Sequence, residues 1–163
     1  MNFIVAVSED YAIGNNNKLL FNLPTDLKYF KEKTLNKVVV MGKNTYMSLP
    51  KRPLKNRINI VLSSNLDFKE EGVIVVHSFI ELFEELENYN TDDVFVIGGA
   101  SLYNKLMKYC KYGYITKVEK IVPADTYITN VEELENWQEI SSSTTINEND
   151  TNFKFKVFEN KEL

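Results

Sequence analysis

The sequence predicts an α/β fold in which helices cover a mostly parallel β-sheet. Short runs rich in β-branched and aromatic residues recur along the chain, as is typical of strands. Helical patterns fall between several of these runs, and this alternation favours parallel strands joined by helices. Two runs, VVVM and VFVI, are apolar without a break, which indicates central strands that are covered on both faces.

The predicted elements follow one another along the chain. The strand runs are FIVAV, KVVVM, INIVL, VIVV, VFVIG and GYITKVE. The helical patterns cover residues 24–35, 43–49, 79–88 and 100–109. Near the C-terminus, WQEISSSTTI and FKFKVFE flank the polar segment NENDT, which predicts a hairpin that joins the sheet antiparallel.

The composition is that of an ordinary globular protein, with 44% hydrophobic and 26% charged residues, and it predicts one domain over residues 1–163. A net charge of -4 argues against nucleic-acid or anionic-membrane partners, because these require clustered basic residues. The first residues, MNFIVAVSED, have too short an apolar run for a signal peptide or a membrane span. They are expected to form a buried first strand.

The chain has one cysteine, Cys110, and one histidine, His77. One chain can therefore build neither a disulfide nor a Cys/His zinc site, so a reduced cytoplasmic protein without a metal is expected. No catalytic triad can be justified around His77, which ends the run VIVVH. Cys110 is expected to be a small buried residue.

Asp26 stands near the start of a predicted helix whose inward face would carry Leu23, Leu27 and Phe30. Pro24 fits the first helical position, so Asp26 lies in the first turn. An acid there can simply complement the positive end of the helix. However, Asp26 shares a face with Phe30, so its carboxylate is expected to border an apolar wall, and a poorly solvated acid is a candidate functional group.

Two segments, VVVMGKNTYMSL and VFVIGGASLYNKLM, share a strand, a glycine turn and a helix. Free N–H groups at the two helix starts could hold a pyrophosphate between them, although glycine can also serve only to make a tight turn. Neither segment has the complete GxGxxG or Walker A spacing. Ser63 and Ser64 end the strand INIVL where a NAD site often places an acid, and with Lys43 they suggest tolerance of a 2′-phosphate.

The segment LPKRPLKNR contains both arginines of the chain, Arg52 and Arg57. The planar fork of arginine suits a carboxylate held by two hydrogen bonds, although a solvated surface arginine is the more common case. Thr116, in YITKV, would by default be only a strand former.

These segments, in this order and spacing, resemble dihydrofolate reductases of the bacterial single-chain type essentially from end to end. The resemblance rests on AIGNNNKLLFNLPTDLKYFKEKTLNKVVVMGKNTYMSL, RPLKNRINIVLSS, VFVIGGASLY, YITKV and ADTY. It implies an eight-stranded sheet with four flanking helices, NADPH as hydride donor and dihydrofolate as acceptor. It also implies a monomer, with antifolates such as methotrexate or trimethoprim as inhibitors.

For the substrate, the resemblance implies that Asp26 accepts hydrogen bonds from the 2-amino group and ring N–H of the pterin, with Thr116 bonding Asp26. Backbone carbonyls at Ile4 and Ile97 would take the other ring amine, and Arg57 would hold the glutamate α-carboxylate. The residues implied at the catalytic centre are Asp26, Thr116, Leu19 and Phe21. The implied substrate-binding residues are Ile4, Val5, Asp26, Leu27, Phe30, Leu49, Leu54, Arg57, Ile97 and Thr116.

For the cofactor, the resemblance implies contacts from both glycine turns and a lid formed by residues 14–22. The residues implied around the nicotinamide are Ala6, Ile13, Gly14 and Leu19, and Ile97 is implied as a further cofactor-binding residue. Those implied along the phosphates are Gly42, Lys43, Asn44, Thr45, Gly98, Gly99, Ala100, Ser101, Leu102 and Tyr103. Those implied at the adenosine and its 2′-phosphate are Lys43, Ser63, Ser64 and His77.

Hydride would pass to C6 of the pterin and a proton to N5, with Asp26 polarising the ring while a water delivers the proton. The pKa of Asp26 is expected to exceed the ordinary value of about 3.9, because desolvation outweighs the field of the helix end. Two departures matter. Leu20 and Phe21 stand where most bacterial relatives carry Pro-Trp, which removes an indole N–H, and Lys43 replaces a common arginine.

Two other functions are compatible with parts of the pattern. A related pterin or pyrimidine reductase would use the same scaffold but is expected to lack the LPTDL helix and the RPLKNR segment. A catalytically silent nucleotide-binding module needs the glycine turns but not Asp26, Thr116 and Arg57.

Overall fold

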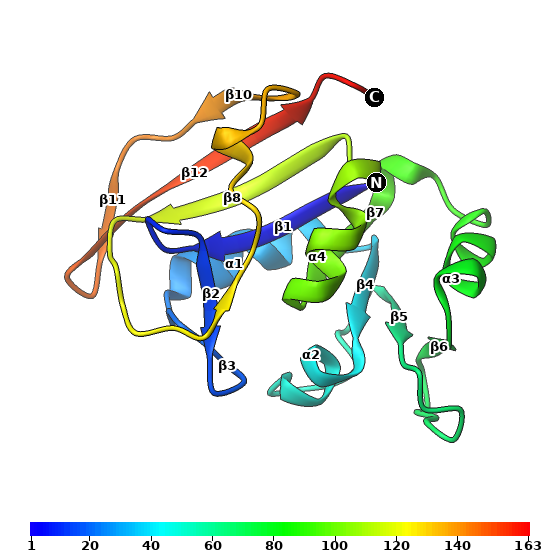
Figure 1. Cartoon of the computed structure of the whole chain (residues 1–163). Coiled ribbons are helices and arrows are strands. Elements are labelled where there is room, and N and C mark those ends of the chain that lie inside the picture. The colour runs from blue at the N-terminus through cyan, green and yellow to red at the C-terminus, as the bar shows by residue number, and fades with distance from the viewer.

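The computed structural model describes residues 1–163 and contains one large mixed sheet (Figure 1). Its strands follow the order β10-β12-β8-β1-β7-β4-β5-β6, and β11 pairs with β12 as a ninth strand. The strand bounds are β1 Asn2–Val7, β4 Val38–Gly42, β5 Ile58–Leu62, β6 Ile74–Val76, β7 Val94–Gly98, β8 Tyr112–Val118, β10 Trp137–Ser142, β11 Ile146–Glu148 and β12 Thr151–Asn160. The six strands from β8 to β6 are parallel, and β10, β11 and β12 add antiparallel pairs, as predicted.

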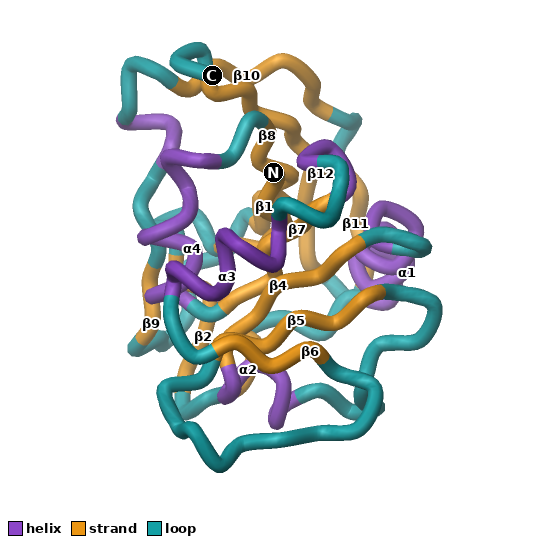
Figure 2. The backbone as a smooth tube through the Cα atoms, turned by 90° about the vertical axis from the view of Figure 1, so that its right-hand side faces the viewer, coloured by secondary structure: helices purple, strands orange, loops and turns teal.

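All four predicted helices are present, each slightly shorter than its pattern. The helix bounds are α1 Pro24–Thr34, α2 Lys43–Ser48, α3 Phe79–Leu86 and α4 Ala100–Leu106, with short 3₁₀ turns at η1 Thr91–Asp93, η2 Met107–Tyr109 and η3 Val131–Glu133. Figure 2 shows α3 and α4 on one face of the sheet and α1 on the other. None of these helices has the length and apolar character needed to cross a membrane.

The central strands are covered on both faces, which explains their unbroken apolar runs. Val38 and Val40 of β4 belong to the main core, which includes Leu82 of α3 and Leu106 of α4. Val39, between them, points to the opposite face and packs in a smaller cluster with Met41, Val61 and Tyr46 of α2.

A second, small sheet was not predicted. It has the strand order β3-β2-β9, with β2 at Ala12–Asn15, β3 at Lys18–Leu19 and β9 at Thr126–Tyr127. Strands of two to four residues are too short for a period-2 pattern to stand out in the sequence. This sheet holds the predicted lid as a hairpin against β9.

β1 separates from its neighbour β7 toward the carboxyl end of the two strands. β1 pairs with β8 over six residues, but with β7 only at Asn2↔Phe95 and Phe3↔Val96. The two strands therefore separate after Phe3, and Ile4 and the residues after it have no ladder partner on the β7 side. In open α/β sheets, ligands bind where the strands at the carboxyl edge separate in this way.

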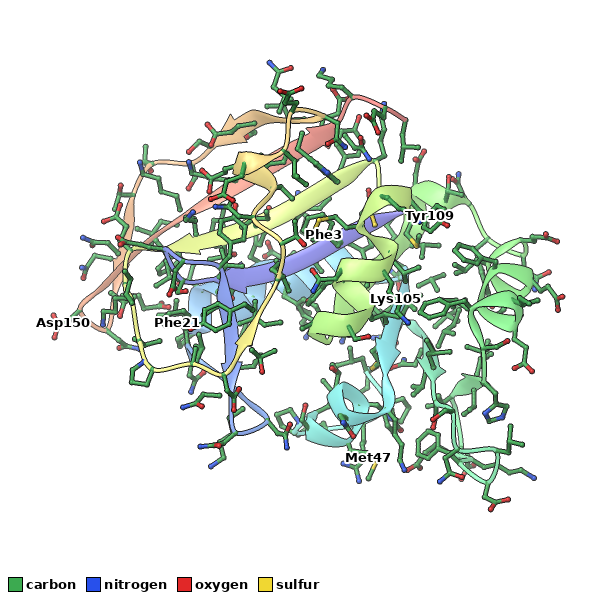
Figure 3. The ribbon with its side chains drawn as sticks, in the orientation of Figure 1. Phe3, Phe21, Met47, Lys105, Tyr109 and Asp150 are labelled. Atoms are coloured by element: carbon green, nitrogen blue, oxygen red, sulfur yellow. The ribbon has the colours of Figure 1, made fainter.

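Phe3, on β1, fixes how α4 and the C-terminal strands pack. Its ring meets Tyr103 edge-on at 6.2 Å and Trp137 at 5.6 Å between ring centroids, and Figure 3 shows it between β1 and α4. The ring lies against Gly113 of β8, where an added Cβ would come within 2.4 Å of Phe3 Cζ. Only glycine fits at position 113 while this ring stays in place.

Candidate active site

Asp26, in the first turn of α1, is bound by a side chain of β8. The Thr116 hydroxyl donates a hydrogen bond of 2.6 Å to Asp26 Oδ1. Thr116 is buried, and Ala6 lies opposite it in the parallel β1–β8 register. The structure thus brings together the acid and the threonine that the resemblance pairs, beside the carboxyl end of β1.

The pKa of Asp26 lies above the ordinary value of an aspartic acid, as predicted. The main cause is burial, which disfavours the charged carboxylate. The negative charge of Glu148 acts in the same direction, whereas the hydrogen bond from Thr116 opposes both. Asp26 therefore keeps its proton to a higher pH than an exposed aspartic acid does.

Glu148, on β11, is bound to the same helical turn. Thr25 donates its backbone N–H to Glu148 Oε1 at 3.0 Å and its hydroxyl to Glu148 Oε2 at 2.6 Å. Nothing in the sequence signals this contact, because Glu148 stands in the polar segment NENDT, 123 positions after Thr25.

The apolar side chains predicted on the inward face of α1 and those expected around the pterin differ in burial. Leu23 is buried, but Leu27 is 50% exposed and therefore does not belong to an inward, core-facing side of α1. Phe30 is half-buried. Leu49 and Leu54 are half-buried on the second cluster described above, together with Ile97.

Arg57 lies at the other end of α1. Its Nη1 donates to the Thr34 hydroxyl at 3.1 Å and its Nε to the Lys55 carbonyl at 2.9 Å. It forms no ion pair in the chain, and partial burial lowers its pKa. Asp26 and Thr34 are eight residues apart, so the acid and the guanidinium mark two ends of a region about 12 Å long along the helix.

The two glycine turns meet, as expected from their parallel strands. A Cβ on Gly98, where φ is +130°, would lie 3.4 Å from the Thr45 hydroxyl of α2, and one on Gly99 would lie 3.5 Å from it. Neither Gly42 nor Gly99, the residues that precede α2 and α4, offers a side chain to cap the helix. The N–H groups of both helix starts are therefore close together and free of side-chain caps.

Tyr103, on α4, connects the second glycine turn to β1. Its hydroxyl donates a buried hydrogen bond of 2.8 Å to the Ile4 carbonyl. The Ile4 carbonyl, which is expected to accept a hydrogen bond from the pterin amine, therefore already uses one of its two lone pairs. Burial, with the charge of Asp26 as a second cause, raises the pKa of Tyr103, so its hydroxyl stays a donor.

The residues expected near the adenosine are only partly available. Ser63 is buried, and its hydroxyl accepts the Asn65 N–H at 3.2 Å. His77 Nδ1 donates to the Ser63 carbonyl at 2.8 Å, which turns its other ring nitrogen away from that carbonyl. Ser64 is exposed. Lys43 Nζ, at the start of α2, lies 5.2 Å from the ring centre of Phe68, which is on the loop that also carries Ser64. Of the two serines, Ser64 therefore has the accessible side chain.

The predicted lid, residues 14–22, is held by the loop before β9. Asn16 donates its N–H to Asp125 Oδ2 at 3.0 Å, and the Asp125 N–H donates to the Gly14 carbonyl at 3.1 Å. Leu19, expected at the nicotinamide, is 80% exposed. Phe21, expected at the catalytic centre, packs against the third core cluster, which contains Leu23, Val118 and Phe153.

Comparison with known proteins gives relatives along the whole chain. The family model described as dihydrofolate reductase matches residues 1–160. The dihydrofolate reductase of Buchnera aphidicola subsp. Acyrthosiphon pisum is 34% identical over 159 residues, covering 96% of this chain and 97% of that protein. The Bacillus subtilis dihydrofolate reductase is 35% identical over 163 residues, covering 99% of this chain and 95% of that protein.

The fold has a solved counterpart. A dihydrofolate reductase from Enterococcus faecalis, complexed with NADP(H) and RAB-propyl, superposes with a TM-score of 0.86 at 32% identity. The match covers 97% of this chain and 94% of that one. By sequence and by structure, the chain is a member of the dihydrofolate reductase family.

Proposed function

We propose that the chain reduces 7,8-dihydrofolate to 5,6,7,8-tetrahydrofolate, using NADPH, at the carboxyl end of β1, where β1 and β7 separate. Family membership supports the reaction. The observation in this chain that carries the proposal is the Asp26–Thr116 pair, in which a half-buried carboxylate accepts a hydrogen bond of 2.6 Å from a buried threonine. A partly desolvated acid needs polar partners, and the flat polar edge of a pterin would supply them.

In this proposal Asp26 recognises and polarises the pterin. Thr116 donates to Oδ1, so Oδ2 is left to accept a hydrogen bond from the pterin edge. Bound NADPH supplies the hydride. The protein orients the two rings and excludes water, while a water molecule carries the proton to N5. The raised pKa of Asp26 keeps a proton available in the site at a higher pH than an exposed acid would.

The remainder of the substrate would extend along α1 toward Arg57. The free N–H groups of Arg57 would hold the glutamate α-carboxylate about 12 Å from Asp26. The proposed substrate-binding residues are Ile4, Val5, Asp26, Leu27, Phe30, Leu49, Leu54, Arg57, Ile97 and Thr116.

The joined glycine turns fit the cofactor, because the space that a Cβ on Gly98 or Gly99 would fill is left open beside the Thr45 hydroxyl. Free N–H groups at both helix starts suit a pyrophosphate. Lys43, Ser64 and His77 would meet the 2′-phosphate, with Ser63 acting through its carbonyl, which holds the His77 ring. The other proposed contacts are Ala6, Ile13, Gly14, Leu19, Gly42, Asn44, Thr45, Ile97, Gly98, Gly99, Ala100, Ser101, Leu102 and Tyr103.

The function is tested by mixing the purified chain with NADPH and dihydrofolate and following the absorbance of the reduced nicotinamide. Steady loss of absorbance that methotrexate inhibits competitively with dihydrofolate supports the proposal. Binding of NADPH without turnover would favour the silent nucleotide-binding module. Turnover only with a pterin or pyrimidine that lacks the glutamate tail would favour a related reductase.

The Arg57→Lys substitution is expected to raise the KM for dihydrofolate about tenfold and to leave kcat nearly unchanged, because lysine keeps the charge but loses the fork. A dihydropterin without the glutamate tail provides the sharper comparison, since its KM is expected to stay constant. Arg52→Lys is the matched control, because Arg52 donates to the Met47 carbonyl and lies over the ring of Tyr46. An equal rise in KM for both substrates would show that Arg57 does not bind the glutamate tail.

The Lys43→Ala substitution is expected to raise the KM for NADPH about tenfold and that for NADH far less, since NADH lacks the 2′-phosphate. The NADH measurement also controls for the lost contact with Phe68. Equal changes with both cofactors would place the 2′-phosphate elsewhere.

The proposal treats residues 1–163 as one catalytic domain that acts as a monomer, since one chain supplies every proposed group. We propose a cytoplasmic location, since the chain has a single cysteine, Cys110, and folds without an internal disulfide. Antifolates such as methotrexate and trimethoprim are proposed to compete for the contacts of Asp26.

A further inference from the structure

The helix that carries Asp26 begins without a cap of its own. Its N-cap residue is Leu23, whose side chain cannot accept a hydrogen bond, and Pro24 has no N–H. The Thr25 N–H is therefore the first donor that needs a partner from elsewhere in the chain. Glu148 meets it with one carboxylate oxygen and meets the Thr25 hydroxyl with the other.

Glu148 is itself held firmly by its hairpin. It pairs with Thr151 across a two-residue turn, in which Asn149 and Asp150 have φ of +53° and +57°. Positive φ at both positions is the geometry of the tight turns that suit twisted hairpins. Figure 3 shows Asp150 at the tip of this hairpin, at the left edge of the molecule.

The same hairpin is tied to both sides of the site. Ile146 packs with Leu23 and Phe153 in the third core cluster, directly under the start of α1. Further along β12, Phe155 lies opposite Thr116 in the antiparallel β12–β8 register. One strand therefore sets the positions of Thr116, which binds Asp26, and of Glu148, which binds the residue before it.

The charge of Glu148 is not neutralised by any other group. Neither Glu148 nor Asp26 forms an ion pair with a lysine or arginine. The other ionisable groups coupled to Asp26 are Tyr103 of α4 and Tyr29 of α1, whose pKa values are both raised, so both are neutral near pH 7. Glu148 is thus the one carboxylate whose charge raises the pKa of Asp26.

We propose that Glu148 is a positioning residue for the reaction: through its two contacts with Thr25 it fixes the first turn of α1, and it holds a carboxylate beside the turn that carries Asp26. The bond to Thr25 sets where the acid lies, and the charge sets how readily the acid keeps a proton. The inference rests on the proposed function for its catalytic meaning, but its geometry and electrostatics can be measured in the chain without substrate.

The Glu148→Gln substitution separates the two effects. Glutamine has the same size and still offers Thr25 one acceptor oxygen, but it removes the charge. We expect the titration midpoint of the Asp26 carboxyl, followed by ¹³C NMR in the purified full chain, to move to lower pH. The pH profile of hydride transfer is expected to move in the same direction. Glu87→Gln, which changes an exposed carboxylate at the C-terminal end of α3, is expected to change neither.

The Glu148→Ala substitution tests the positioning. Without an acceptor, hydrogen exchange of the Thr25 amide is expected to accelerate. The KM for dihydrofolate is expected to rise about fivefold, which is the change in an equilibrium constant that corresponds to the usual stability cost of a lost helix cap. Circular dichroism and the thermal midpoint show whether this variant still folds. If it does not, Thr25→Val, which keeps the charge and loses only the hydroxyl contact, is expected to leave the Asp26 midpoint close to that of the unmodified chain.

An unchanged Asp26 midpoint in Glu148→Gln, with normal turnover of dihydrofolate, would overturn the inference while leaving the proposed function intact. A shifted midpoint in a chain that does not reduce dihydrofolate would support the coupling of the two carboxylates and reject the proposed function. The two failures are therefore distinguishable.

Discussion

The Asp26→Asn substitution is expected to lower the rate of dihydrofolate reduction at pH 7 by at least about a hundredfold, the lower range for loss of an acid–base group. Asparagine presents an NH₂ group where the pterin edge needs an acceptor, and it can neither carry a charge nor release a proton. The rate of hydride transfer, measured in single turnovers across pH, reports this directly. A pH profile identical to that of the unmodified chain would contradict the role assigned to Asp26.

The same substitution is expected to stabilise the fold at neutral pH. Asp26 has a raised pKa when folded, so ionisation opposes folding above that pKa. The penalty is absent below about pH 3.9, where the acid is protonated in both the folded and the unfolded chain. The thermal midpoint of Asp26→Asn is therefore expected to exceed that of the unmodified chain at pH 7, and the difference is expected to vanish as the pH falls toward 3.9. Thr116→Val, which removes the hydrogen bond to Oδ1, is expected to lower the midpoint at pH 7.

The Gly113→Ala substitution is expected to lower the free energy of unfolding by about 3 kcal/mol, at the high end for overpacking in a core. The new Cβ would lie 2.4 Å from Cζ and 2.7 Å from Cε1 of Phe3, whose ring is 1% exposed and enclosed by Tyr103 and Trp137. The ring has no free space to enter, so β8 or α4 has to move. Urea denaturation followed by circular dichroism measures the loss.

A second substitution tests the cause of this loss. In a Phe3→Leu background the smaller side chain leaves room for the Cβ, so Gly113→Ala is expected to be much less destabilising there than in the unmodified chain. If the two losses simply add, the overlap with the Phe3 ring is not their cause.

Most of the main sheet could be predicted because its strands are long enough for their composition to stand out. The uninterrupted run VVVM correctly predicted a strand covered on both faces. The segment WQEISSSTTI predicts one strand, but β10 ends at Ser142, and β11 begins at Ile146, the last residue of the segment, and continues into NENDT. Its serine and threonine residues are compatible with both strands and turns, so its composition does not show the break.

The candidate site was predictable where local pattern and position agreed. Pro24 fixed the start of α1 and thereby placed Asp26 in the first turn. The spacing of apolar residues along a helix, however, does not show whether that face packs in the core or is exposed. The prediction that Leu27 lies on the core-facing side of α1 is therefore wrong. The Glu148 contact depends on tertiary structure alone, because two distant segments meet there and neither has an unusual composition.

The dependence of this site on β12 has a consequence for the order in which the protein is made. Asp26 is synthesised 90 residues before Thr116, and Thr25 is synthesised 123 residues before Glu148. A nascent chain therefore carries Asp26 without its partner until Thr116 has left the ribosome, and Thr25 without its partner until Glu148 has left it near the end of the chain. Activity is expected to arise only at the end of translation, and a chain truncated before residue 148 is expected to lack it however well its parallel strands have formed.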